Sequence, residues 1–238
     1  MVFVIADACV NFRNLGEAGT IIKEAARAGV DAVKFQAYRS EDVIKHERWQ
    51  DLTRIVLLER EIRHLNIVCK HNHVEFMCTP MYQEAVKMLF PYVRRWKVRY
   101  DDRNNVHLFQ AIYNDPRPVL VSCSGIHDTI WLRSKRRRNI VLMFCVPEYP
   151  PARVNLIRNF KPMGGFSSHY ADWTVPLEAV KLGADFLEVH VMLDDYSRDD
   201  GEENERDPWI PIDAPVSLNM TDLKKLVREI RNFDLLQV

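Results

Sequence analysis

Two histidines end apolar runs in the second half of the chain, and their spacing could build a metal or catalytic site. His169 ends the run Gly164-Gly-Phe-Ser-Ser-His169, and His190 ends Asp185-Phe-Leu-Glu-Val-His190. The interval of about twenty residues fits one loop, one helix and one strand. We therefore expect both imidazoles at the carboxyl ends of neighbouring parallel strands, where they could share a divalent ion. The alternative is that one or both are hydrogen-bonded core or rim residues.

Other chemically capable side chains lie at the ends of further apolar runs. Two ammonium groups and several hydroxyls could hold an anion, and a phosphate-bearing substrate beside a divalent cation would use the whole set. Each lysine could instead be paired with a carboxylate for stability alone, because an unpaired buried lysine is costly. The residues in question are Asp7, Lys34, Gln36, Thr79, Lys97, Ser122, Ser124 and Ser167.

The elements that would position these groups alternate between strand and helix patterns. Short apolar runs such as 2–6, 31–35 and 74–78 predict buried parallel strands. Eight such runs alternate with eight helical patterns, which favours a closed (β/α)₈ TIM barrel over an open doubly wound sheet. We expect one domain spanning 1–238, with helices that include 51–71, 127–135 and 152–159, and a last helix capped by Thr221.

Composition excludes several classes of protein. The 238 residues contain 33 Lys+Arg and 33 Asp+Glu, so the chain lacks the basic excess of a nucleic-acid binder. No apolar run approaches the roughly 18 residues that span a membrane. Five cysteines without metal-finger spacing indicate reduced, buried thiols in a cytoplasmic protein. The basic run 133–138 is interpreted as a surface feature, with a nucleic-acid role as the lesser alternative. The irregular stretch 194–218, which is strongly acidic over 194–207, is interpreted as a solvated loop, with a lid as the alternative.

Several motifs together resemble the sialic acid (N-acetylneuraminate) synthase family. Ala28-Gly-Val-Asp-Ala-Val-Lys-Phe-Gln36 is almost identical to a family strand, and Phe76-Met-Cys-Thr-Pro80 and Trp96-Lys-Val98 have family counterparts. The opening Ile5-Ala-Asp-Ala-Cys-Val-Asn11 and the two histidine segments also match. The resemblance covers nearly the whole barrel, so it is far more specific than any one motif.

The resemblance implies an enzyme that joins phosphoenolpyruvate to the open-chain aldehyde of an N-acyl-hexosamine and releases phosphate. It further implies a manganese or magnesium ion on His169 and His190 that polarises the aldehyde. Asp102 would position the water that adds to C2, and Asp7 stands at the position of a family glutamate. Asp213 would bind the sugar. The phosphoenolpyruvate contacts would come from Lys34, Gln36, Thr79, Lys97, Ser124 and Ser167.

Departures from the family pattern lie mainly among the sugar contacts, so we expect an altered acceptor. Arg99-Tyr-Asp-Asp102 replaces a Gly-Ser-Gly-Glu segment, and Phe144 replaces a histidine. We expect no C-terminal antifreeze-like domain, which in the family reaches across a homodimer. Small-molecule substrates are the expected partners. Two alternatives stay open: a barrel that has lost catalysis and serves as a binding or scaffold protein, and a different metal-dependent aldolase or lyase.

Overall fold

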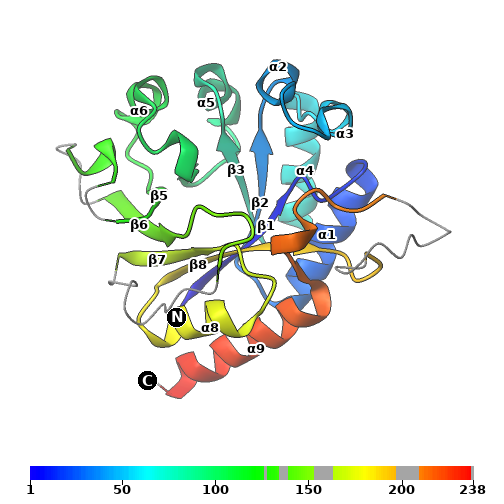
Figure 1. Cartoon of the computed structure of the whole chain (residues 1–238), viewed down its shortest axis with the longest axis vertical. Coiled ribbons are helices and arrows are strands. Elements are labelled where there is room, and N and C mark those ends of the chain that lie inside the picture. The colour runs from blue at the N-terminus through cyan, green and yellow to red at the C-terminus, as the bar shows by residue number, and fades with distance from the viewer. Residues whose placement is uncertain (126–127, 134–138, 153–162, 197–208, 237–238) are drawn as a thin grey trace.

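A computed structural model describes residues 1–125, 128–133, 139–152, 163–196 and 209–236. Parallel strands form a nearly closed barrel surrounded by helices, which confirms the predicted (β/α)₈ class (Figure 1). The hydrogen-bonded order is β3-β2-β1-β8-β7-β6-β5-β4, and a two-residue strand β9 pairs with β8. The strands are β1 (Phe3–Cys9), β2 (Ala32–Ala37), β3 (Glu75–Pro80), β4 (Trp96–Val98), β5 (Val119–Cys123), β6 (Ile140–Cys145), β7 (Gly164–Ser168), β8 (Phe186–Met192) and β9 (Leu218–Asn219).

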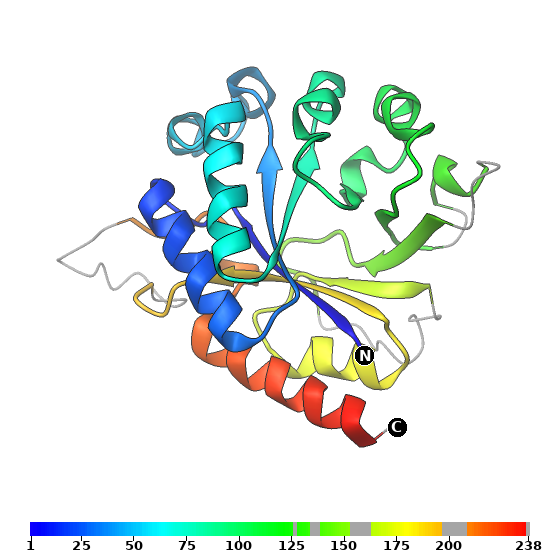
Figure 2. The ribbon, with the colours of Figure 1, turned by 180° about the vertical axis from the view of Figure 1, so that it is seen from behind.

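Helices cover the outside of the barrel, and Figure 2 shows the longest of them, α9, running beside α1. Asn14 accepts a hydrogen bond from the Glu17 amide at the start of α1, and Gly29 ends that helix in the left-handed conformation. No helix in the described part of the chain is long and apolar enough to cross a membrane. The α-helices are α1 (Leu15–Ala28), α2 (Ser40–Val43), α3 (Trp49–Arg54), α4 (Glu59–His71), α5 (Gln83–Leu89), α6 (Val106–Ile112), α8 (Thr174–Lys181) and α9 (Met220–Leu236); the 3₁₀ turns are η1 (Tyr100–Asp102), η2 (Ile130–Arg133) and η4 (Ala214–Val216).

The inside of the barrel is layered along the strand direction. An apolar layer is formed by Ile5, Ala32, Met77, Leu120 and Met143. Side chains two residues further along a strand point to the same side. The next layer toward the carboxyl ends is therefore the polar one that holds Asp7, Lys34, Thr79, Ser122, Cys145 and Glu188. A larger apolar core lies between the strands and the surrounding helices.

Some predicted element bounds were wrong. The helix expected over 51–71 is two helices, α3 and α4. Thr221 does not cap the last helix, because α9 starts one residue earlier and the Asn219 side chain accepts a hydrogen bond from the Asp222 amide. The described part of the helix expected at 127–135 contains only the 3₁₀ turn η2.

Three predicted features fall wholly or mostly on residues that the structure does not describe. The helix expected at 152–159 lies outside the described residues from 153 onward. The basic run 133–138 is outside from 134 onward, and the acidic stretch 194–207 from 197 onward.

Candidate active site at the carboxyl ends of the strands

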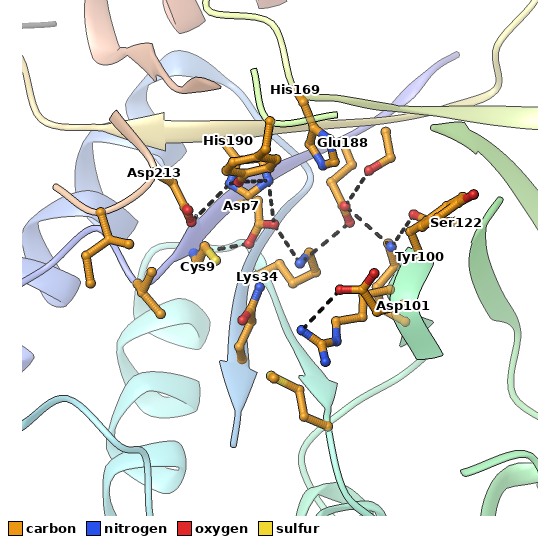
Figure 3. A pocket seen from close by; sticks show the side chains of 18 of the residues that line it. Asp7, Cys9, Lys34, Tyr100, Asp101, Ser122, His169, Glu188, His190 and Asp213 are labelled. Carbon is orange, nitrogen blue, oxygen red and sulfur yellow. Dashed lines mark hydrogen bonds and ion pairs between the residues drawn. The ribbon is translucent and has the colours of Figure 1, made fainter. Parts of the chain in front are cut away.

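A cavity of about 360 Å³ opens at the carboxyl ends of the barrel strands (Figure 3). This is the end of a TIM barrel at which active sites are built. The cavity lining combines charged, hydroxyl, thiol and imidazole groups. Among the predicted site residues, it includes Asp7, Lys34, Gln36, Lys97, Ser167, His169, His190 and Asp213.

A buried network of charges forms the floor of this cavity. The Lys34 Nζ lies 2.7 Å from Asp7 Oδ2 and 3.8 Å from Glu188 Oε2. The other carboxylate oxygen of Glu188, Oε1, lies 3.5 Å from Lys97 Nζ. All four side chains are at most 4% exposed. The network thus brings together four strands, β1, β2, β4 and β8, through charges that only pairing makes tolerable in the interior.

Burial and neighbouring charges together set the pKa values of Glu188, Lys34 and Lys97. Burial alone would raise the pKa of Glu188, but Lys34 and Lys97 outweigh it and hold that pKa at about 2. Burial would lower the pKa of Lys34, yet Asp7 and Glu188 raise it above its ordinary value. The pKa of Lys97 is lowered, because burial outweighs the attraction of Glu188. At neutral pH, Lys34 is therefore a fixed cation, whereas Lys97 is the lysine less fully compensated by nearby carboxylates.

Hydroxyl groups complete the hydrogen bonding of the floor. Lys97 Nζ donates to Ser122 Oγ at 2.6 Å, and Ser167 Oγ donates to Glu188 Oε1 at 2.9 Å. Lys34 Nζ donates to Thr79 Oγ1 at 3.3 Å. These contacts orient both ammonium groups beside the cavity, where they could hold a small polyanion.

His190 stands between two carboxylates at one side of the cavity. Its Nε2 lies 3.7 Å from Asp7 Oδ2, and its Nδ1 lies 3.6 Å from Asp213 Oδ2. The Tyr149 hydroxyl is 3.2 Å from Nε2. Burial would lower the pKa of His190, but Asp7 and Asp213 outweigh it and raise that pKa. The imidazole is thus surrounded by groups that favour a cation at this position.

Asp213 is held in place by a separate set of buried contacts. Its amide donates to Asn11 Oδ1 at 2.9 Å, and its carbonyl accepts from Ser217 Oγ at 2.7 Å. Asn11 Nδ2 in turn donates to that same Ser217 oxygen at 2.8 Å. The fixed carboxylate therefore faces His190 from the opposite side to Asp7.

His169 lies near His190 in a less polar environment. The centroids of the two rings are 5.4 Å apart, and the Tyr149 ring packs edge-on against His169. His169 Nδ1 lies 3.0 Å from the Val146 carbonyl, to which it would donate, and Cys145 Sγ is 3.9 Å from the ring nitrogens. Burial, together with His190, lowers the pKa of His169 to about 4. Its imidazole is therefore neutral at physiological pH.

One group of side chains has both the chemistry and the spacing of a metal site. Within the described part of the chain, ligand atoms of Asp7, Cys9 and His190 lie within 4.8 Å of one another. Among the described residues, the buried Oδ2 atom of nearby Asp213 has no hydrogen bond of normal length, although His190 Nδ1 lies 3.6 Å away and Cys9 and Tyr149 also lie beside this carboxylate. Carboxylate, thiolate and imidazole are established ligands of divalent transition metals. The donor set and the unsatisfied oxygen therefore fit a divalent cation.

The structure does not bring every predicted residue to the cavity. Asp102 is buried outside the lining, where its Oδ2 accepts from Arg99 Nε at 2.6 Å. Ser124 also lies outside the lining and donates to Asp128 Oδ2 at 2.7 Å. The 3₁₀ turn η1 presents Tyr100 and its neighbours to the cavity while Asp102 turns inward. Thr79 is not in the lining either, but it reaches the site through Lys34.

Several lining residues had no role in the sequence prediction. Glu188 links both lysines, and its position two residues before His190 in an apolar strand was a usable signal, because residues i and i+2 share a face. Ser122 was included among the hydroxyls that could hold an anion but not among the implied phosphoenolpyruvate contacts. Cys9 and Tyr149 gave no local signal, since only the tertiary structure places them beside His190.

Comparisons with known proteins extend over the whole barrel. A model of the NeuB family matches residues 21–237. An uncharacterized protein of Methanocaldococcus jannaschii is 29% identical over 96% of this chain and 70% of its own length. The N,N'-diacetyllegionaminic acid synthase of Campylobacter jejuni is 26% identical over 96% of this chain and 75% of its own. The crystal structure of the N-acetylneuraminic acid synthetase of Leptospira borgpetersenii has a TM-score of 0.80 at 26% identity and covers 97% of this chain and 83% of that one.

Proposed function

Because this chain belongs to the NeuB family, we propose that it condenses phosphoenolpyruvate with an aldehyde sugar to give a 2-keto acid and phosphate. The synthases among its relatives support this reaction class. The observation that carries the proposal is the pair of buried lysines, Lys34 and Lys97, beside one cavity. Two ammonium groups held by hydroxyls suit the carboxylate and phosphate of phosphoenolpyruvate.

The floor of the cavity binds phosphoenolpyruvate in this proposal. Lys97 supplies the charge that an incoming anion neutralises, and Lys34 supplies a second, fixed cation. Two hydroxyls lie beside the lysines, because Ser167 donates a hydrogen bond to Glu188 and Thr79 accepts one from Lys34. Gln36 lines the same cavity and offers an amide to a substrate oxygen. Orientation of both anionic groups would leave C3 of phosphoenolpyruvate directed at the acceptor.

The side of the cavity around His190 serves the aldehyde. C3 of phosphoenolpyruvate forms a bond to the aldehyde carbon as the C=O π bond opens, and the aldehyde oxygen takes up a proton to become a hydroxyl. Water adds to C2 and loses a proton; the C2–O bond to phosphate then breaks, the second proton leaves, and C2 becomes the keto group. A divalent ion beside His190 supplies a Lewis acid for the aldehyde oxygen when bound. Asp7 and Asp213 keep this side of the cavity negative, and Asp213 also lies where it could accept a hydrogen bond from a sugar hydroxyl.

The acceptor differs from the one implied by the family pattern. Arg99, Tyr100 and Asp101 line the cavity, at positions where the resemblance to the family implies small residues. These larger side chains reduce the room near the acceptor. Asp102 acts as a positioning residue in this arrangement, because its carboxylate holds Arg99 rather than facing the cavity.

Replacement of Lys97 tests the anion half of the site. Lys97→Met should weaken phosphoenolpyruvate binding by about 10-fold or more, since a buried charged hydrogen bond contributes about 1.5–3 kcal/mol. Calorimetric titration of phosphoenolpyruvate measures this change. Lys87→Met, on the exposed side of α5, is the matched control and should bind as the native protein does.

Turnover is tested by phosphate release with phosphoenolpyruvate and a panel of aldehyde sugars that includes N-acyl-hexosamines. Release that depends on the sugar supports the condensation. Tight phosphoenolpyruvate binding without release for any sugar would favour a barrel that binds without catalysis. Absence of phosphoenolpyruvate binding by the native protein would contradict the proposal.

A further inference from the structure

We propose that the Cys9 thiolate is a ligand of the divalent ion, together with Asp7 and His190, and that the ion is therefore of the thiophilic zinc, cobalt or iron class. This inference rests on the proposed function, in which an ion lies beside His190. It differs from the predicted pair of His169 and His190 in both the place of the ion and its chemistry. Thiolate ligands favour such ions, whereas magnesium takes oxygen ligands.

The distances between the three candidate ligands suit one small ion. Their ligand atoms lie within 4.8 Å of one another, and His190 Nε2 is 3.7 Å from Asp7 Oδ2. Ligands about 2.0–2.3 Å from a tetrahedral ion are roughly 3.3–3.8 Å apart. Small side-chain shifts would therefore complete the contacts. Asp7 Oδ2 also contacts Lys34, but a carboxylate has about four lone-pair sites and can serve both partners.

The backbone of β1 bends so that Cys9 and Asp7 meet. The pairing of β1 with β2 shifts register between these two residues. Cys9 has a φ of 45°, in the left-handed region, and its amide donates to Asp7 Oδ1 at 3.1 Å. A non-glycine residue in this region costs of order 1–3 kcal/mol, and such strain clusters at functional sites. The bend places the buried thiol in the cavity lining beside His190.

The surroundings of Asp7, Cys9 and His190 also favour a bound cation. Asp213 faces His190 from the other side, and its buried Oδ2, 3.6 Å from His190 Nδ1, makes no hydrogen bond of normal length within the described residues. An ion at Asp7, Cys9 and His190 would place a positive charge next to this carboxylate. Metal binding would displace the thiol proton of Cys9 into solvent, because the thiolate is the ligand.

A second thiol, that of Cys145, distinguishes an ion bound by Asp7, Cys9 and His190 from an ion bound by the predicted pair His169 and His190. Cys145 lies 3.9 Å from the His169 ring nitrogens and also lines the cavity. An ion centred on His169 would have Cys145 as its nearest thiol, whereas an ion on the β1 side of His190 has Cys9. The other three cysteines, Cys69, Cys78 and Cys123, are buried and lie outside the cavity lining.

Titration of the metal-free protein with Co²⁺ alone tests the proposal, because only a thiolate ligand gives an intense near-ultraviolet charge-transfer band. The native protein should develop this band, and Cys145→Ser should retain it. Cys9→Ser should lose the band and bind Co²⁺ more than about 10-fold more weakly. Loss of a group that only hydrogen-bonds to a metal ligand already weakens metal binding by about 10-fold or more, and loss of a ligand should weaken it further. Excess Mg²⁺ should not displace the Co²⁺.

Two results would overturn the proposal: Co²⁺ binding by the native protein without the band, or a band that Cys145→Ser removes and Cys9→Ser retains. If Cys9→Ser does not fold, ¹¹³Cd NMR of the native protein decides, since a shift typical of oxygen and nitrogen ligands alone excludes the thiolate. Phosphoenolpyruvate binding, measured separately, shows whether the proposed function stands when the thiolate ligand fails.

Discussion

At the scale of single residues, Glu188 is the group on which the charges of the cavity floor depend. Its two carboxylate oxygens face Lys34 at 3.8 Å and Lys97 at 3.5 Å, and its side chain is 4% exposed. Without Glu188, the four-residue floor network would contain two ammonium groups, those of Lys34 and Lys97, and one carboxylate, that of Asp7. Glu188 thus keeps both lysines in place for an anionic substrate.

Neutralisation of Glu188 should destabilise the protein and change its pH dependence. Glu188→Gln should lower the free energy of unfolding at pH 7 by about 3–5 kcal/mol, the usual cost of breaking a buried ion pair. In the native protein the pKa of Glu188 is held at about 2, below its ordinary value of 4.5. The unfolded chain therefore takes up this proton first as pH falls, and the stabilisation present above about pH 4.5 is lost toward pH 2.

Urea unfolding between pH 2 and pH 7 measures both effects. The native protein should lose stability over that window more steeply than Glu188→Gln. The control is Glu41→Gln, because Glu41 is 68% exposed and pairs with Arg39 at the surface. Equal pH slopes for native protein and Glu188→Gln would exclude a depressed carboxylate at this position.

At the scale of elements, the contact between β7 and β8 sets the position of the two histidines. Gly165 of β7 pairs with Phe186 of β8. A methyl group at Gly165 would lie 2.9 Å from the Phe186 carbonyl oxygen and 3.0 Å from its Cβ. The strands approach so closely that only glycine fits without a shift of backbone.

Gly165→Ala should therefore reduce the free energy of unfolding by about 1–3 kcal/mol through overpacking. Gly19→Ala is the matched control, since a methyl group there meets nothing within 4 Å. Alanine at this helical position of α1 should stabilise the protein by about 0.5–1 kcal/mol. Guanidinium unfolding of both variants gives the comparison, and an unchanged midpoint for Gly165→Ala would show that the strands can separate at little cost.

At the scale of the whole molecule, the barrel has a seam between its terminal strands. The ladder of described strands ends at β3 on one side and β4 on the other, although these two strands lie in contact. Side chains bridge this seam, because Arg95 Nε and Nη2 donate to the two carboxylate oxygens of Glu75 at 2.8 and 2.9 Å. The Arg95 guanidinium also lies 4.0 Å from the centre of the Phe3 ring.

Arg95→Met should open this seam locally. The bidentate pair is largely buried, so its loss should cost about 1–3 kcal/mol. Amides of β3 and β4 should then exchange with solvent about 10-fold faster or more in hydrogen-exchange measurements. Arg60→Met removes a 91% exposed arginine that, among the described residues, pairs with its neighbour Glu61, and it should leave exchange unchanged. Uniform acceleration across all strands would instead indicate global destabilisation.

The amino-acid sequence by itself determined the class of fold and most of the cavity floor. Period-two burial and helix periodicity are local properties, so the alternation of elements and the polar strand ends could be recognised without coordinates. A lysine in an apolar strand, such as Lys34, had to be partnered for the same local reason. The single helix expected over 51–71 was wrong, because the chain leaves the helical conformation between α3 and α4, where Ile55 and Leu57 pack into the core.

Only the tertiary structure decided which side chains meet. The register Asp7↔Lys34 and Asp7↔His190 joins residues far apart in the sequence, and it selects the partners of the lysine and the imidazole. The turn η1 directs Asp102 away from the cavity, and the bend in β1 brings Cys9 to His190. Local pattern sets which face a side chain occupies, whereas strand register and loop geometry set its neighbours, and the chemistry of this site depends on those neighbours.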